Sequence, residues 1–235
     1  MILYTNQNKK INMKAFSIRH GEQKYPYNEE GKKMVSGVNA PLVDSGRVQI
    51  RELRQELNRQ NISLDAIYRS PLLRAEQSAN ELAGEDLIAI HEVDGLKEGF
   101  PNSAEGHTYE ELEAIGGDIY AHPFSPDQET LEHLVQRTRD AMEFILRDVK
   151  ERGYNTIAIV EHGDHLCALD WSIKHEVPPP TYAEMRDSYY PQKGQALEYT
   201  LDPNLKLEGE GRIITTEAAK QTIEGFRSSP QKEVE

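Results

Sequence analysis

Two histidines, each followed by glycine, stand at equivalent places in the sequence. His20 follows Arg19 at the end of a short apolar pattern over residues 14–18, and His162 follows a continuous apolar run over residues 156–160. Both runs are typical of buried β-strands. Because α/β folds bind ligands beyond the carboxyl ends of their strands, we expect the two imidazoles to lie at one edge of a sheet.

A second arginine is expected to join this group. Arg74 lies one turn into a helix that the sequence predicts after a short strand, and Pro71 suits the first helical position. Arginine offers planar hydrogen-bond donors to phosphate oxygens, and a neutral imidazole can attack phosphorus without a metal. Two arginines beside two histidines therefore indicate phosphoryl transfer, a reaction that depends mainly on positioning and on the stabilisation of charge.

Strands that alternate with helices predict the scaffold that positions these side chains. We expect an α/β fold, a three-layer α/β/α sandwich with a mostly parallel central sheet. The most regular helix is predicted over residues 129–152, where apolar side chains recur at helical spacing. The expected strands cover residues 14–18, 66–69, 87–91, 156–160 and 196–201, and the other main helices cover residues 44–60, 72–82 and 165–174.

The chain of 235 residues is long enough for one sizeable domain with additions at both ends. We expect an N-terminal extension over residues 1–13, the main domain over residues 14–207, and an acidic, loosely ordered tail over residues 208–235. Many Gly, Pro, Asn and Glu residues predict an insertion or lid at about residues 94–128, with a short helical piece inside it.

The charge balance argues against large anionic partners. The sequence has 27 Lys and Arg against 40 Asp and Glu, a formal net charge of -13. We therefore expect no nucleic-acid or membrane partner, and affinity for phosphate must come from a local pocket. Cys167 is the single cysteine, so no intrachain disulfide can form, and the sequence has no signal-peptide pattern or long apolar run. We expect a soluble, cytoplasmic protein.

The order of the motifs resembles the histidine phosphatase superfamily, also called the phosphoglycerate mutase-like family. An Arg-His-Gly tripeptide alone is a weak signal, but four matching blocks in the right order are a strong one. The resemblance spans about residues 14–201 and implies a phosphoglycerate mutase-like fold. Its blocks are residues 16–22 (Phe-Ser-Ile-Arg-His-Gly-Glu), residues 39–46 (Asn-Ala-Pro-Leu-Val-Asp-Ser-Gly) with Gln49, residues 70–75 (Ser-Pro-Leu-Leu-Arg-Ala) with Gln77, and residues 160–163 (Val-Glu-His-Gly).

The resemblance implies a pocket in which His20 attacks the phosphoryl group. The phosphoryl oxygens would be held by Arg19, Arg74 and His162. Neighbouring guanidinium groups disfavour imidazolium, so they favour the neutral His20 that attack requires, while His162 can take a proton once a phosphate dianion is bound. The family's frequent asparagine after the nucleophile is matched by Asn28, two residues late, which is the candidate for a further phosphate contact. No metal and no cofactor are implied.

A leaving alkoxide needs a proton, which the family takes from a carboxylic acid in the segment after the second strand. Glu98 is the first candidate, because residues 95–101 resemble the family's Leu-x-Glu-Gly-x-Pro version of that segment. Glu92 is the alternative, since some branches place the acid directly after the strand. A carboxyl that faces a bound phosphate dianion should have its pKa raised, which suits an acid.

Three functions remain open at the level of sequence. The first is a phosphomonoesterase that hydrolyses a small phosphorylated metabolite, the second is a phosphoglycerate-type mutase, and the third is a regulatory protein-binding module of the same fold. The Trp-Asn pair that the mutase branch has after the nucleophile is absent, which favours the phosphatase. His165 lies three residues after His162, but no third ligand supports a metal site. A homodimer is left open.

Overall fold

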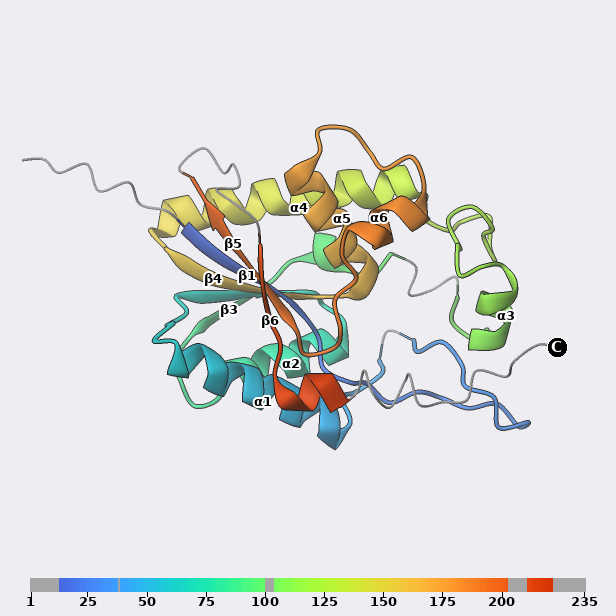
Figure 1. The fold of residues 1–235 in the computed structure, drawn as a ribbon, viewed down its shortest axis with the longest axis horizontal. Coiled ribbons are helices and arrows are strands. Elements are labelled where there is room, and N and C mark those ends of the chain that lie inside the picture. Colours follow the sequence, from blue (N-terminus) through green and yellow to red (C-terminus); the bar gives the residue numbers. More distant parts are fainter. Residues whose placement is uncertain (1–12, 38, 100–103, 203–210, 222–235) are drawn as a thin grey trace, which may run out of the picture.

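The computed structural model describes residues 13–37, 39–99, 104–202 and 211–221. Within these residues the strands form one sheet in the order β3-β2-β4-β1-β5-β6, with helices on both of its faces (Figure 1). The strands are β1 (Met13–Arg19), β2 (Ala66–Arg69), β3 (Ala89–Glu92), β4 (Thr156–Glu161), β5 (Ala196–Leu201) and β6 (Arg212–Ile214). The helices are α1 (Asp44–Arg59), α2 (Leu73–Ala83), the 3-10 turn η1 (Asp94–Leu96), α3 (Tyr109–Ala114), α4 (Leu131–Arg152), α5 (Gly163–Lys174) and α6 (Tyr182–Ser188).

The sheet is mixed but mostly parallel. Strands β3, β2, β4 and β1 run parallel to one another, while β5 is antiparallel to β1 and β6 is antiparallel to β5. The parallel strands are nearly continuous apolar segments because helices cover both of their faces. The predicted three-layer α/β/α sandwich is confirmed.

Alternation along the strands divides the core into two layers. Phe16, Ile18 and Val160 point to the face that α1 and α2 cover. Ala15 and Ile159 point to the other face and belong to the core cluster that includes residues of α4 and α5. Figure 1 shows α1 and α2 on one face of the sheet and α4 and α5 on the other. No described helix is long and apolar enough to cross a membrane.

Two elements were not predicted from sequence. The short edge strand β6 lies where we expected a loose acidic tail, and its Ile214 is buried against the core while Ile213 is half exposed. Helix α6 follows the Pro-rich loop and is capped by Thr181, whose hydroxyl accepts the N–H of Glu184. Both elements are short, so their stability depends on tertiary contacts that sequence periodicity does not reveal. We predicted an N-terminal extension over residues 1–13, but Met13 is the first residue of β1. The rest of the extension, residues 1–12, lies outside the described residues, as do residues 203–210 and 222–235.

The predicted insertion begins at η1 and includes α3. Helix α3 starts with a capping box, in which Thr108 and Glu111 each accept from the other's backbone N–H. The chain before α3 pairs with the loop after β1, because Met34 bridges to Thr108 and the Val35 N–H donates to the His107 carbonyl at 2.9 Å. The insertion therefore lies beside the loop that follows His20, although its action as a lid remains a prediction.

The packing of α1 on the sheet predicts a large stability difference between two positions of that helix. Leu53 is fully buried, whereas Val48 is 42% exposed. Leu53→Ala should lower the free energy of unfolding by about 2–5 kcal/mol, because it removes apolar contacts and leaves a cavity. Val48→Ala should change it by about 0.5 kcal/mol or less. Urea denaturation checks this, and equal small effects would contradict the assigned inner face of α1.

Candidate active site

The pairing of β1 with β4 brings the two His-Gly motifs together. The two strands are parallel neighbours whose register ends with Arg19 opposite Glu161, and the His20 N–H donates to the Glu161 carbonyl at 3.0 Å. Both strands therefore finish at the same edge. The rings of His20 and His162 lie with centroids 5.1 Å apart, and both side chains are buried.

His20 is held as a neutral imidazole with its lone pair on Nε2. Its Nδ1 lies 2.7 Å from the Gly21 carbonyl, which can only accept, so Nδ1 carries the hydrogen. The lone pair is then on Nε2, where the Arg74 Nε–H donates at 3.2 Å. Burial first, and then the charges of Arg74 and Arg19, hold the pKa of His20 well below its usual value. This is the state that nucleophilic attack requires.

Close backbone packing fixes the turn after His20. A Cβ on Gly21 would overlap the backbone of Gly46, and a Cβ on Gly46 would overlap the backbone of Glu22. The Gly21 N–H also donates to the Ser78 hydroxyl of α2 at 3.1 Å. The glycines of the first two sequence blocks are thus needed for the close approach of two loops.

Arg74 enters the site from the first turn of α2. Its Nη1 donates to the Gly37 carbonyl at 3.1 Å, and only 4% of the residue is exposed. Burial lowers the pKa of Arg74, and the negative charge of Glu98 opposes that effect. A buried guanidinium whose Nε contacts the nucleophile lies where it can bind the group that His20 attacks.

Arg19 and His162 each keep a buried nitrogen without a partner among the described residues. Arg19 donates from Nη1 to the Pro191 carbonyl at 2.8 Å and stacks on Tyr190, but its Nε is unpaired. His162 Nε2 contacts the Ser70 hydroxyl at 2.8 Å, and its Nδ1 is unpaired. Unpaired buried polar atoms are costly, so these two nitrogens are suited to a polar ligand such as a phosphate.

The surroundings of His162 favour its neutral form. Burial first, and then the charge of Arg74, hold its pKa well below the usual value. A phosphate dianion placed beside the ring would act in the opposite direction and favour protonation. Protonation of His162 on phosphate binding stays a prediction.

Of the two candidate acids, Glu98 lies nearer the cationic groups. Its negative charge acts on Arg74, and it contributes to the raised pKa of Asp164. Glu92 instead makes an ion pair with Arg69 at 3.0 Å, and its side chain is 56% exposed. Strand β3 is separated from β1 by two strands, so the end of β3 lies roughly 14 Å from that of β1. The arrangement favours Glu98 over Glu92.

The Asn28 side chain is hydrogen-bonded to the backbone of its own turn. Its Oδ1 accepts the backbone N–H groups of Glu30 and Lys32 at 3.1 and 2.8 Å. This is the usual way in which an asparagine closes a loop. A phosphate contact by Asn28 is left as a prediction without support from these hydrogen bonds.

A buried lysine joins the site from the loop before β5. Lys193 Nζ contacts Glu22 Oε1 at 2.9 Å and the Tyr25 hydroxyl. Burial lowers the pKa of Lys193 to about 7, and its charge is among those that lower the pKa of His20. Sequence reasoning missed Lys193, because a lone lysine in a loop far along the chain carries no motif.

Asp164 is the second group that the sequence did not single out. It accepts from the hydroxyls of Tyr182 at 2.8 Å and Tyr120 at 3.2 Å. Burial, with a contribution from Glu98, raises the pKa of Asp164 to about 7. The neighbouring position 163 needs a glycine, because a Cβ there would lie 2.6 Å from the Tyr190 hydroxyl.

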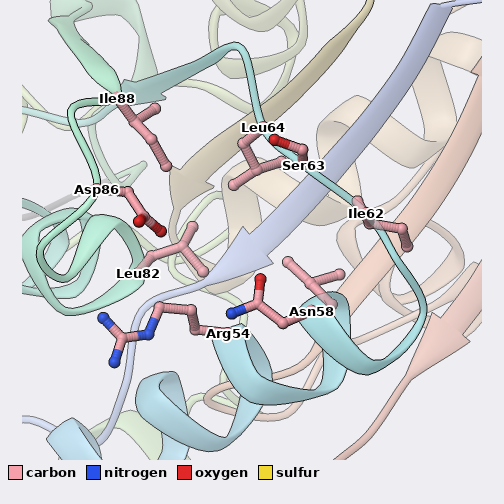
Figure 2. Close-up of a pocket in the computed structure, with 9 residues that line it drawn as sticks. Arg54, Asn58, Ile62, Ser63, Leu64, Leu82, Asp86 and Ile88 are labelled. Carbon is pink, nitrogen blue, oxygen red and sulfur yellow. The ribbon is translucent and has the colours of Figure 1, made fainter.

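A separate small cavity lies near the amino-terminal ends of β2 and β3 (Figure 2). It has a volume of about 110 Å³ and lies between the end of α1 and the segments that lead into β2 and β3. Its lining includes Arg54, Asn58, Leu64 and Asp86. These segments precede their strands, so this cavity is not part of the site at the carboxyl ends.

Comparison with known proteins gives the family. Residues 16–187 match the histidine phosphatase superfamily (branch 1). An uncharacterized phosphatase of Bacillus subtilis, PhoE, is 31% identical over 154 residues, which are 65% of this chain and 72% of that protein. The chain therefore belongs to the histidine phosphatase superfamily, and it is a phosphatase.

Solved structures share the fold. Bacillus stearothermophilus YhfR is 26% identical with a TM-score of 0.66, and the match covers 83% of this chain and 94% of YhfR. A phosphoserine phosphatase from Entamoeba histolytica, in complex with 3-phosphoglyceric acid, has a TM-score of 0.64 at 24% identity, and the match covers 88% and 98% of the two chains. The predicted phosphoglycerate mutase-like fold is confirmed.

The hydrogen bonds and charges around His20 predict its state in solution. At pH 6.5, where an ordinary histidine is half protonated, His20 should remain neutral with its hydrogen on Nδ1. Ring ¹⁵N NMR of the ligand-free protein measures this, with His20→Gln used to assign the signals. A His20 ring that is half protonated at pH 6.5, or a hydrogen on Nε2, would contradict the geometry.

Proposed function

We propose that this protein is a metal-independent phosphomonoesterase that acts through a phosphohistidine at His20 on a small phosphorylated metabolite. The observation that carries the proposal is the neutral, buried His20, whose Nε2 lone pair contacts the Arg74 guanidinium. A nucleophile beside a cation is arranged for an anionic electrophile. Phosphoryl transfer is the chemistry that such positioning and charge best support.

In the first step, the phosphate would enter between the two arginines and the two histidines. The Arg74 Nε–H, which donates to His20 Nε2, would turn to a phosphoryl oxygen. The unpaired nitrogens of Arg19 and His162 would bind other oxygens. His20 Nε2 would then form the N–P bond as the ester P–O bond breaks, and the guanidinium groups would stabilise the oxygens of the transition state.

Glu98 would act on the leaving group. As a carboxylic acid it would transfer its proton to the departing alkoxide oxygen, so an alcohol is released. As a carboxylate it would then take a proton from a water molecule that attacks phosphorus. The P–N bond breaks, inorganic phosphate forms, and neutral His20 and protonated Glu98 are restored.

The burial of the site supports a small substrate. His20, Arg74 and His162 are exposed by only 2%, 4% and 0%, so the phosphoryl group must reach into the fold. A compact ester can do so more easily than a phosphate on a folded protein surface. The Entamoeba histolytica phosphoserine phosphatase, which shares the fold, was solved with 3-phosphoglyceric acid, a compound of this size class.

Hydrolysis of p-nitrophenyl phosphate in the presence of a chelator tests the proposed function. The parent protein should be active, and His20→Ala should lose at least about a thousandfold in kcat, since it removes the nucleophile. His133→Ala, an exposed substitution on α4, is the control and should stay close to the parent. Activity that the chelator abolishes, or that survives His20→Ala, would overturn the proposal.

A further inference from the structure

The segment that carries Glu98 is held by an unusual set of contacts. Gly95 packs so closely on α4 that a Cβ at this residue would lie 2.8 Å from the Ala141 Cβ. Leu96 is fully buried in the core beneath it. Beyond these contacts, the carbonyl oxygens of the segment accept hydrogen bonds from two side chains on neighbouring helices.

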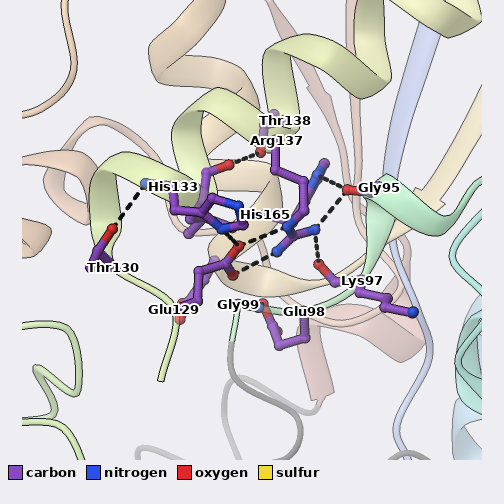
Figure 3. Close-up of polar contacts among 12 residues, drawn as sticks. Gly95, Lys97, Glu98, Gly99, Glu129, Thr130, His133, Arg137, Thr138 and His165 are labelled. Carbon is purple, nitrogen blue, oxygen red and sulfur yellow. Dashed lines mark hydrogen bonds and ion pairs between the residues drawn. The ribbon is translucent and has the colours of Figure 1, made fainter. Parts of the chain in front are cut away.

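The first of these side chains is Arg137 on α4. Its Nη1 donates to the carbonyls of Gly95 at 2.7 Å and Lys97 at 2.9 Å. Its Nε and Nη2 donate to the two oxygens of Glu129 at 2.8 and 2.7 Å. Figure 3 shows the guanidinium between the segment and Glu129. A guanidinium fixed on both sides holds the two carbonyls before and after Leu96.

The second side chain is His165 on α5. Its Nε2 lies 2.9 Å from the Gly95 carbonyl, and its Nδ1 contacts Glu161. The Gly95 carbonyl can only accept, so Nε2 carries a hydrogen, and a second hydrogen lies between Nδ1 and the Glu161 carboxyl group. The other oxygen of Glu161 accepts from the Ser17 hydroxyl of β1. His165 and Glu161 are both completely buried.

The Glu161–His165 pair connects the candidate acid to the candidate phosphate site. Glu161 is the last residue of β4, and His162 follows it directly. His165 lies in the first turn of α5, which begins after His162. The same few residues that place His162 therefore also hold the Gly95 carbonyl, three residues before Glu98. Both nitrogens of His165 are engaged, which explains its presence without a metal.

We propose that the Glu161–His165 pair, together with Arg137, positions Glu98 over the leaving group, and that these are positioning residues for proton transfer. The inference rests on the proposed function, because it assumes that Glu98 is the acid. Loss of the hydrogen bonds from His165 or from Arg137 should let residues 95–99 shift. A displacement of the acid should slow esters with a basic leaving group far more than esters whose leaving group departs without a proton.

The experiment compares kcat/KM for glycerol 2-phosphate, which has an alkoxide leaving group, with kcat/KM for p-nitrophenyl phosphate. His165→Asn removes the bond to Gly95 and should lower the first value by about tenfold or more while changing the second by less than about threefold. His165→Gln, whose amide can reach the position of Nε2, should recover part of the loss. A merely structural effect would lower both values together.

Arg137→Met gives a second, independent measurement if His165 variants fail to fold. Arg137 is partly exposed, and its loss removes the bonds to both carbonyls. It should show the same selective loss on glycerol 2-phosphate. Arg139→Met is the matched control on the same helix, since Arg139 donates to the distant His175 carbonyl, and it should leave both values unchanged.

Glu98→Gln separates failure of this inference from failure of the proposed function. If Glu98→Gln lowers kcat/KM equally for the two substrates, Glu98 is not the acid and the proposed function needs another one. If Glu98→Gln selectively lowers kcat/KM for glycerol 2-phosphate but His165→Asn and Arg137→Met do not, the positioning inference is wrong while the proposed function stands. Selective loss in all three, without further loss when Arg137→Met is added to Glu98→Gln, supports the inference.

Discussion

A histidine surrounded by guanidinium groups and removed from water must remain uncharged, and the site depends on this constraint. Water would stabilise imidazolium, but the His20 ring is buried, and Arg74 and Arg19 repel a positive charge on it. The Gly21 carbonyl then decides which nitrogen keeps the hydrogen. The lone pair is left on Nε2, next to a donor that binds phosphate well. Burial, charge and one backbone hydrogen bond together prepare the nucleophile.

The sheet brings the other candidate site residues next to His20. Parallel pairing of β1 with β4 places His20 and His162 side by side, and the helix after β2 adds Arg74 from a third direction. The turns are tight because Gly21 and Gly46 meet backbone to backbone. The segment with Glu98 is not part of these strands. It needs its own attachment, which side chains of α4 and α5 supply through hydrogen bonds to backbone carbonyls.

The sequence predicted the residues whose positions follow directly from the strands that carry them. Apolar runs ending at Arg19-His20 and at His162 predicted the sheet, its mostly parallel order and the meeting of the two histidines, because strand ends in such folds share an edge. Sequence reasoning could not see Lys193 or Asp164, whose importance comes from burial beside residues far away in the chain. It also missed β6 and α6, which are too short to show periodicity.

Two charged residues at strand ends have structural roles. Glu161 ends β4 and pairs with His165 in the interior. Arg69 ends β2 and makes an ion pair with Glu92 at 3.0 Å. The sequence alone does not identify these partners, because they follow from the packing of helices and strands around the sheet.

The central claim is that Nε2 of His20 forms a bond to phosphorus, and trapping the phosphoenzyme tests it most directly. Protein mixed rapidly with substrate and quenched in alkali should yield an alkali-stable, acid-labile phosphate on the peptide that contains His20. ³¹P NMR of that peptide should show phosphorus bonded to Nε2, the nitrogen that the Gly21 hydrogen bond leaves with a lone pair. Phosphate on Nδ1 or on another residue, or turnover without any phosphoenzyme, would contradict the account.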